Sequence, residues 1–317
     1  MLHVRDILVP TDFSPHATHA ITYAVALAKM YESTLHFVHC VDCSMYAQGT
    51  ANSKFLSAED LGTLESSMRE HAESQMATFA TGFESEGLTF VTHIAIGKPA
   101  QEILRAAENL SCDLVVLSTH GRSGLDHMVF GSVCERIVRQ SSVPVLSIKR
   151  KSHECVDCVT SEIHVRKVLF PYDFSDYSER ALPAAVALCR DFQAKLIIVH
   201  VNEIPPALPD VMPEVSLQMN AGIDDYARQT MERLKPVLRD VDAELMMLLG
   251  APHREISKLV HEAQIDLVVM ATHGRSGVAH MLFGSVAEKV VRTAQCPVLT
   301  IRPVEVPSEV EVLSQTG

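Results

Sequence analysis

The stretch DLVVLSTHGRSG at residues 113–124 returns almost unchanged as DLVVMATHGRSG at residues 266–277. In both places a short apolar run ends directly in small residues and glycines. Such a run predicts a strand buried on both faces, whose carboxyl end opens into a tight turn or a ligand-binding loop. Its recurrence predicts that the chain contains one folding unit twice.

Two further pairs of blocks support a tandem repeat. VRDILVPTDFS at 4–14 aligns with VRKVLFPYDFS at 165–175, and SSVPVLSIKR at 141–150 aligns with AQCPVLTIRP at 294–303. The blocks keep the same order in both halves, and we therefore divide the chain into two domains. The predicted parts are domain 1 at 1–150, a linker at 151–162, domain 2 at 163–303 and a flexible tail at 304–317.

Within each copy, short β-branched apolar runs alternate with longer segments of helical periodicity. In the first copy the strand candidates are 6–10, 34–41, 89–97, 113–119 and 144–148, and the helix candidates are 16–32, 64–87, 100–110 and 132–140. This alternation predicts right-handed crossovers between parallel strands. We expect an α/β fold of two tandem doubly wound domains, each a five-stranded parallel sheet with helices on both faces.

The composition restricts the function classes. The 317 residues are 47% hydrophobic and 21% charged, which is typical of a globular protein. A net charge of −12 argues against a nucleic-acid partner. No apolar run approaches the roughly 18 residues of a membrane span, and no signal peptide precedes the first strand candidate. We therefore expect a cytoplasmic protein with no membrane partner, and reduced thiols for its eight cysteines.

The glycine stretch has two interpretations. Gly131 and Ser132 come directly before a helix candidate, and Gly284 and Ser285 repeat this arrangement. A helix start carries free N–H groups and partial positive charge, so it can hold a phosphate. Glycine and serine before a helix also form an ordinary turn and cap. The spacing matches neither the Walker loop nor the dinucleotide fingerprint.

Together, these motifs resemble the universal stress protein family in its tandem two-domain form. The resemblance covers nearly all of both halves. It rests on P-T-D-F-S or P-Y-D-F-S at the first strand, V-H at the second, G-x-P before a helix, and T-H-G-x9-G-S followed by P-V-L. It implies the adenine nucleotide alpha hydrolase-like fold. The family's ATP-binding branch is marked by G-x-x-G-x9-G-[ST].

The resemblance implies binding of ATP, or of another adenine nucleotide, at one or both domains. It implies a role in stress response or signalling without fast catalysis, with slow ATP hydrolysis at most. Whether Mg²⁺ binds together with the nucleotide is left open. The alternative is a stress scaffold or interaction protein that binds no nucleotide, because both copies lack the first glycine of the motif and have Ser118 or Ala271 there.

The candidate nucleotide-binding residues follow position by position. In the first copy they are Pro10, Thr11, Asp12, Cys40, Ser118, His120, Gly121, Arg122, Gly131, Ser132 and Val133. In the second copy they are Pro171, Tyr172, Asp173, Val201, Ala271, His273, Gly274, Arg275, Gly284, Ser285 and Val286. The resemblance implies adenine contacts by the two aspartates and by the backbone of Cys40 and Val201, and phosphate contacts by the glycine motif.

The two copies need not bind equally. Tyr172 stands where the first copy has Thr11, and a phenol there can stack on adenine or fill its place. This difference favours the first copy. The sequence GSVAEKVV at 284–291 favours the second copy, because it is closer to the family's usual helix start.

The motif CVDC occurs at 40–43 and at 155–158, and His153 precedes the second occurrence. A thiolate pair of this spacing can bind zinc or act as a redox pair. The two occurrences are not at equivalent places in the repeat, so we expect no metal, with His153, Cys155 and Cys158 as the alternative. For His39 and His200 we expect a hydrogen-bonded core or site-lining role.

The repeat also predicts how the halves assemble. Single-domain relatives usually dimerise through the last strand. We therefore expect the segments 144–148 and 297–301 to pair and to form an intramolecular pseudo-dimer. A homodimer of whole chains stays open.

Overall fold

The computed structural model describes residues 3–43, 58–121, 131–149, 155–157, 160–203, 225–226, 228–274 and 284–302. In the first copy the elements are β1 (Asp6–Pro10), α1 (Pro15–Tyr31), β2 (Thr34–Val41), α3 (Ala58–Thr81), the 3₁₀ helix η1 (Glu84–Glu86), β3 (Phe90–Ile96), α4 (Pro99–Asn109), β4 (Leu114–Ser118), α5 (Ser132–Gln140) and β5 (Val145–Ile148). In the second copy they are β6 (Lys167–Pro171), α6 (Asp176–Phe192), β7 (Lys195–Asn202), β8 (Ala243–Leu249), α9 (Pro252–Glu262), β9 (Leu267–Ala271), α10 (Ser285–Thr293) and β10 (Val298–Ile301). The predicted tail and half of the predicted linker lie outside the described residues.

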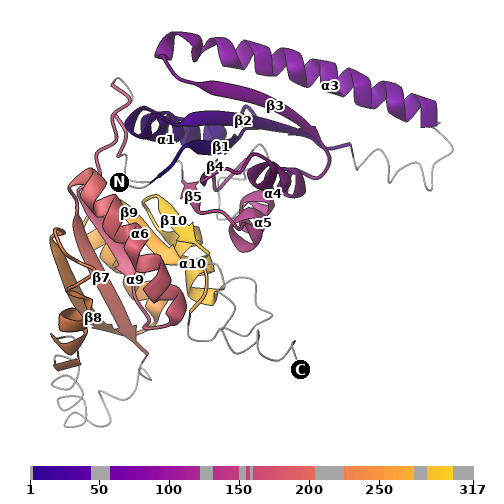
Figure 1. The fold of residues 1–317 in the computed structure, drawn as a ribbon. Coiled ribbons are helices and arrows are strands. Elements are labelled where there is room, and N and C mark those ends of the chain that lie inside the picture. Colours follow the sequence, from indigo (N-terminus) through magenta and orange to yellow (C-terminus); the bar gives the residue numbers. More distant parts are fainter. Residues whose placement is uncertain are drawn as a thin grey trace, which may run out of the picture.

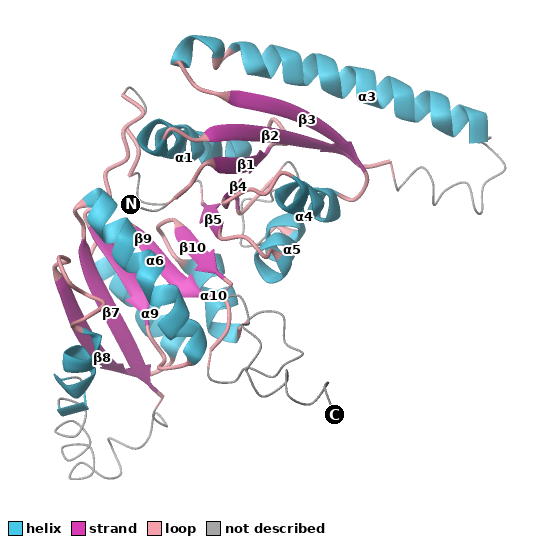
Figure 2. Cartoon of the chain, in the orientation of Figure 1, coloured by secondary structure: helices cyan, strands magenta, loops and turns pink. Residues whose placement is uncertain are grey.

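The strands form one ten-stranded sheet in the order β3-β2-β1-β4-β5-β10-β9-β6-β7-β8 (Figures 1 and 2). Within each copy all neighbouring strands are parallel, which confirms the predicted α/β fold class. The two copies meet at β5 and β10, which pair antiparallel with Leu146 opposite Leu299. The predicted pairing of the last strands is therefore present, and it joins the two sheets edge to edge.

Helices cover both faces of this sheet. The buried side chains of α1, α3 and α6 belong to one apolar cluster, and those of α4, α5, α9 and α10 belong to the other. Successive residues of the central strands point into opposite clusters, as with Ile7 and Leu8. This explains why the strands read as continuous apolar runs rather than as alternating ones. Figure 1 shows the long helix α3 beside the edge strand β3.

An aspartate directly before β4 and its counterpart before β9 fix the start of the central strands. The Asp113 carboxylate accepts hydrogen bonds from the backbone N–H of Arg5 and Asp6, at 2.7 and 3.1 Å. Asp266 accepts the same pair of bonds from the start of β6, at 2.8 and 2.9 Å. These bonds hold β1 beside β4 and β6 beside β9. Strand order reverses there, and in sheets of this kind ligands bind beyond the opposite, carboxyl ends of such strands.

None of the helices in the described ranges combines the length and hydropathy needed to cross a membrane. The seven cysteines in the same ranges are free thiols, and five of them are buried.

Candidate functional site

A buried histidine joins the carboxyl ends of the first two strands in each copy. His39 donates from Nδ1 to the carbonyl oxygen of Thr11 at 2.8 Å, and His200 donates from Nδ1 to that of Tyr172 at 2.7 Å. Both histidines are at least nine-tenths buried. The hydrogen-bonded role predicted for them is therefore confirmed, and we refer to each pair as the histidine brace.

The next two residues turn the chain from strand to helix. Asp12 accepts a hydrogen bond from the backbone N–H of Ser14 at 3.0 Å, and Ser14 in turn caps α1. Phe13 lies between them with a φ of 61°, a conformation that costs a bulky residue energy. Asp173 and Ser175 repeat these contacts at the start of α6. The motif D-F-S therefore builds a rigid turn beside the crevice, and both aspartates are held in place by it.

Gly121 and Gly274 allow these aspartates to approach. A Cβ atom on Gly121 would lie 2.9 Å from the Asp12 Oδ2 atom, and one on Gly274 would contact Asp173 in the same way. A real Cβ atom does not tolerate such a contact without a shift of its neighbours. In this structure a side chain after β4 or β9 would therefore displace the carboxylate of the aspartate in the same copy.

The second glycine of the motif closes the loop. Gly131 donates from its backbone N–H to the Thr119 carbonyl at 2.9 Å, and a Cβ atom on it would lie 3.0 Å from that oxygen. Gly284 makes the equivalent bond to Thr272 at 2.7 Å. The loop between these ends, with the candidates Arg122 and Arg275, lies outside the described residues.

Helices α5 and α10 begin directly after these glycines. Gly131 and Gly284 are the N-cap residues, and no side chain forms a capping hydrogen bond at either helix. The first N–H groups of such a helix and its dipole favour an anion. The candidates Ser132 and Val133 lie in this first turn in the first copy, and Ser285 and Val286 in the second.

In the second copy these elements surround a pocket of about 560 Å³. Its volume lies within the range of ordinary ligand sites. The pocket brings together every described candidate of that copy, namely Pro171, Tyr172, Asp173, Val201, Ala271, His273, Gly274, Gly284, Ser285 and Val286. The first-copy candidates occupy the equivalent strand ends and helix start.

Several residues that line the pocket were not among the candidate residues. Val199, Ile256 and Met270 give it an apolar wall. Asn202, the last residue of β7, and Glu203 directly after it add polar groups. Pro252 opens α9, a second helix without a side-chain cap. Two helix N-termini and an apolar wall suit a ligand with an anionic part and a flat apolar part. The G-x-P motif indicated the α9 start, but no local signal indicated Glu203.

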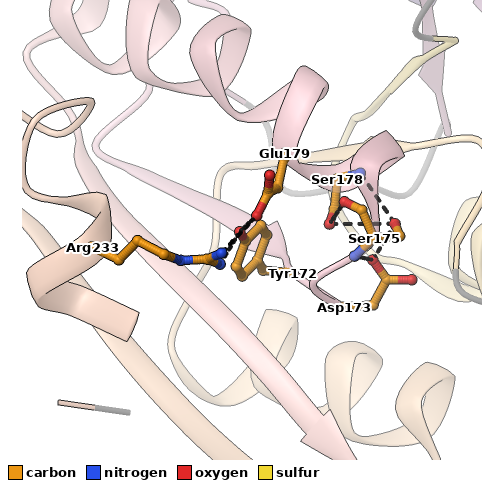
Figure 3. Close-up of polar contacts among 6 residues, drawn as sticks. All are labelled: Tyr172, Asp173, Ser175, Ser178, Glu179 and Arg233. Atoms are coloured by element: carbon orange, nitrogen blue, oxygen red, sulfur yellow. Dashed lines mark hydrogen bonds and ion pairs between the residues drawn. The ribbon is translucent and has the colours of Figure 1, made fainter. Parts of the chain in front are cut away.

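Tyr172 does not behave as the sequence suggested. Its hydroxyl donates to Glu179 Oε1 at 3.1 Å and accepts from Arg233 Nη2 at 3.0 Å, and these two side chains form an ion pair at 3.0 Å (Figure 3). Burial, followed by the Glu179 hydrogen bond, raises the pKa of the phenol. The residue is only 1% exposed, and its ring packs edge-on against Phe174.

The Tyr172 ring belongs to the apolar cluster on the α6 face, whereas the apolar wall of the pocket belongs to the cluster on the opposite face. Its phenol is therefore too buried to stack on a bound base or to take the place of one. The argument that favoured the first copy because of Tyr172 loses its basis.

The remaining first-copy candidates are also held by protein contacts. The Ser118 hydroxyl oxygen accepts a hydrogen bond from the His120 backbone N–H at 3.3 Å, a contact that Ala271 cannot make. The rings of His120 and His273 each contact a threonine hydroxyl at 2.9 Å. Burial, with smaller effects of Glu102 and Asp42, raises the pKa of the Cys40 thiol to about 12, so Cys40 stays protonated at neutral pH.

The alternative metal site receives no support from Cys155. Its thiol is buried and lies 3.3 Å from the Asp266 carbonyl oxygen, to which it donates. His153 and Cys158 lie outside the described residues. Within the described part of the chain, no three histidine, cysteine, aspartate or glutamate side chains are grouped so that they could hold a metal ion.

Comparisons with known proteins agree with this architecture. The model of the universal stress protein family matches residues 3–149 and again 164–302. Universal stress protein Slr1230 of Synechocystis is 24% identical over 319 residues, which cover 94% of this chain and 100% of that protein. A universal stress protein crystal structure from Archaeoglobus fulgidus superposes with a TM-score of 0.64 at 22% identity, covering 95% of this chain and 97% of that chain.

A shorter solved structure, a universal stress protein in complex with cAMP, is 27% identical and covers 44% of this chain and 99% of its own, with a TM-score of 0.33. Because the family model matches both halves, nearly the whole length is accounted for. The chain belongs to the universal stress protein family, in its tandem two-domain form.

Proposed function

We propose that the protein binds ATP, or another adenine nucleotide, at the carboxyl edge of its sheet and acts in stress response or signalling rather than as a fast enzyme. The observation that carries this proposal is the second-copy pocket. All described candidates of that copy line it, and it ends at the uncapped start of α10. The apolar wall suits adenine, and the helix start suits phosphate.

The charges of the pocket refine this proposal. Asp173 and Glu203 are the acidic groups among the described lining residues. Each repels a polyphosphate, so we assign the phosphates to the α10 start and the base and ribose to the part of the pocket beside Asp173. Mg²⁺ would reduce the repulsion. We expect ATP affinity to rise when Mg²⁺ is added.

The two halves would act as an intramolecular pseudo-dimer, with domains at 1–150 and 163–303 joined by the linker 151–162. The antiparallel pairing of β5 with β10 supports this organisation. Each half would then present one nucleotide site at its own carboxyl edge.

Equilibrium dialysis of the purified chain with labelled ATP, with and without Mg²⁺, tests the proposal. cAMP is titrated in parallel because it carries adenine without a polyphosphate. Gly131→Val and Gly284→Val each place side-chain atoms against a backbone carbonyl at the loop end, so each should weaken ATP binding at its own site at least about tenfold. Gly62→Val on α3, where a Cβ atom meets nothing within 4 Å, is the matched control.

The stoichiometry separates one filled site from two. If both copies bind, each variant removes half of the bound ATP, and if one copy binds, one variant removes all of it. Absence of saturable binding in the parent protein would sink the nucleotide proposal and leave the scaffold function, which the substitutions at Ser118 and Ala271 favour. Mass spectrometry of a denatured extract gives an independent answer, because co-purified adenine nucleotide argues against a scaffold.

A further inference from the structure

A second cavity, of about 230 Å³, lies where the two copies meet. Its walls come from both halves, with Leu27 of α1 and Leu146 of β5 on one side and Leu188 of α6 and Leu299 of β10 on the other. None of the described nucleotide-site candidates lines it. The cavity therefore exists only because β5 pairs with β10 and brings α1 and α6 together.

Apart from His3, which is exposed, the ionisable groups around this cavity have hydrogen-bond partners. The Asp113 and Asp266 carboxylates each accept two backbone N–H groups. The Tyr31 hydroxyl donates to Asp191 at 2.9 Å, and the Cys155 thiol donates to the Asp266 carbonyl. The wall between these groups is mostly apolar and partly open to solvent, so an apolar ligand that enters would remove apolar surface from water.

The same wall determines the charge of a ligand. The two carboxylates at its edge, Asp113 and Asp266, disfavour an anion. A cation would have to leave water for a wall whose carboxylates are already occupied by backbone N–H groups, which is costly. The ligand that fits this cavity is therefore uncharged.

The volume sets the size of the ligand. An apolar cavity of about 150 Å³ binds benzene, so one of about 230 Å³ holds roughly nine non-hydrogen atoms at the same density. Tyr23, Tyr31 and Phe192 contribute aromatic rings to the wall. Aromatic rings interact favourably edge-on or offset with one another, beyond the area they bury.

We propose that this cavity binds an uncharged aromatic molecule of one or two fused rings between the two copies. The site is distinct from the nucleotide pocket. Because both halves line the cavity, a bound ligand stabilises the folded state in which the two copies are packed together. The stability of the junction between the copies would then depend on the concentration of a small aromatic compound.

Indole is the probe, because it is uncharged and has nine non-hydrogen atoms. The chain contains no tryptophan, so indole emission excited beyond the tyrosine absorption reports the ligand alone. We expect saturable binding of one indole per full-length chain, with a blue shift of its emission on entering the apolar cavity. Indole-3-carboxylate and indole-3-carboxamide are both larger than indole and nearly equal in size to each other, but only the carboxylate is charged. The carboxylate should bind at least about tenfold more weakly than the carboxamide.

Two substitutions on the same helix locate the site. Ala184 lines the cavity, whereas Ala187 lies on the same helix, is half-buried like Ala184 and does not line the cavity. Ala184→Phe should fill the space and weaken indole binding at least about tenfold, and Ala187→Phe should leave it unchanged. Ala184→Leu introduces a smaller side chain and should reduce indole affinity by an intermediate amount. It replaces Ala184→Phe in the test if the larger ring prevents folding.

The proposal is overturned if the parent protein shows no saturable indole binding. It is also overturned if Ala184→Phe and Ala187→Phe weaken binding equally, or if ATP displaces indole competitively, since the signal would then come from the nucleotide pocket. Binding of indole that survives Gly284→Val and is lost in Ala184→Phe supports the junction site, whatever the outcome for ATP.

Discussion

The two copies agree at the carboxyl edge of the sheet and differ at the amino edge. At the carboxyl edge both have the histidine brace, the aspartate turn and the two glycines with the same contacts. At the amino edge the first copy has a polar chain in which His36 contacts Asp6 at 2.9 Å and His93 at 3.2 Å. The register puts Lys167, Ile197 and Met246 at these places in the second copy.

The difference between the two edges indicates which contacts the duplicated unit requires. The second copy has Ile197 and Met246 in place of the two histidines and Lys167 in place of Asp6, with the same strand order and register. The strand ends that build the candidate site also differ, with Val201, Ala271 and Tyr172 in place of Cys40, Ser118 and Thr11. These differences leave the histidine brace, the aspartate turn and the two glycines in place, and the Tyr172 ring lies on the α6 face. The following predictions test this division, from the largest expected effect to the smallest.

The largest effect is expected at Tyr172, where the copies differ in the core. Tyr172→Ala removes a fully buried ring and should lower the free energy of unfolding by about 3–5 kcal/mol. Tyr172→Phe loses only the contacts with Glu179 and Arg233 and should cost about 1 kcal/mol. Urea unfolding measures both. Thr11→Ala, the matched change in the first copy, should cost less than Tyr172→Ala, and equal losses would break the comparison.

The histidine brace should contribute equally to the free energy of unfolding in both copies. His39→Phe and His200→Phe keep a buried ring but leave a strand-end carbonyl without its donor, so each should cost about 1–3 kcal/mol. The measurement is again urea unfolding, with nucleotide binding as a second readout. A large loss for one variant and none for the other would show that the brace supports only one half.

A smaller effect is expected at the contact between copies made by Arg139. This side chain bonds Glu288 of the other copy at 2.9 Å and Glu135 of its own helix at 3.1 Å, and it is 38% exposed. Arg139→Ala should cost about 0.2–1 kcal/mol, and less at high salt. Arg105→Ala removes an ion pair within one copy and is the control. A loss well above this range would show that the junction depends on this pair.

The smallest effect is a pH dependence at the amino edge of the first copy. Burial, and then the nearby His36, lowers the pKa of His93. Protonation therefore favours the unfolded chain, so the contribution to stability is present above about pH 6.5 and is lost as the pH falls through that value towards the folded pKa.

His93→Met introduces the residue found at the equivalent place of the second copy and should remove this dependence. The free energy of unfolding of the parent, minus that of His93→Met, should decrease as the pH falls from about 7.5 to about 5.5. His71→Met, at an exposed position on α3, is the control and should show a flat difference. A parent profile parallel to that of His93→Met contradicts the prediction.

The fold and most of the candidate site could be predicted because their signals are local. Apolar runs such as Leu114–Ser118 predict buried strands. The block at 113–124, which contains this run and the turn after it, recurs at 266–277. In a doubly wound sheet the strand ends must meet at one edge, so residues from four separate segments could be assigned to one pocket without coordinates.

The sequence by itself determined the duplication and the succession of strands and helices within each copy, since these follow from repeated blocks and periodicity. The resemblance to the family indicated the group of residues at each carboxyl edge. Only the tertiary structure decided which face the Tyr172 ring occupies, that Glu203 joins the pocket, and that a cavity lies between α1 and α6. These features depend on contacts between residues far apart in the chain, such as Tyr172 with Arg233 and Tyr31 with Asp191. Such contacts are fixed by packing and register, which no local pattern encodes.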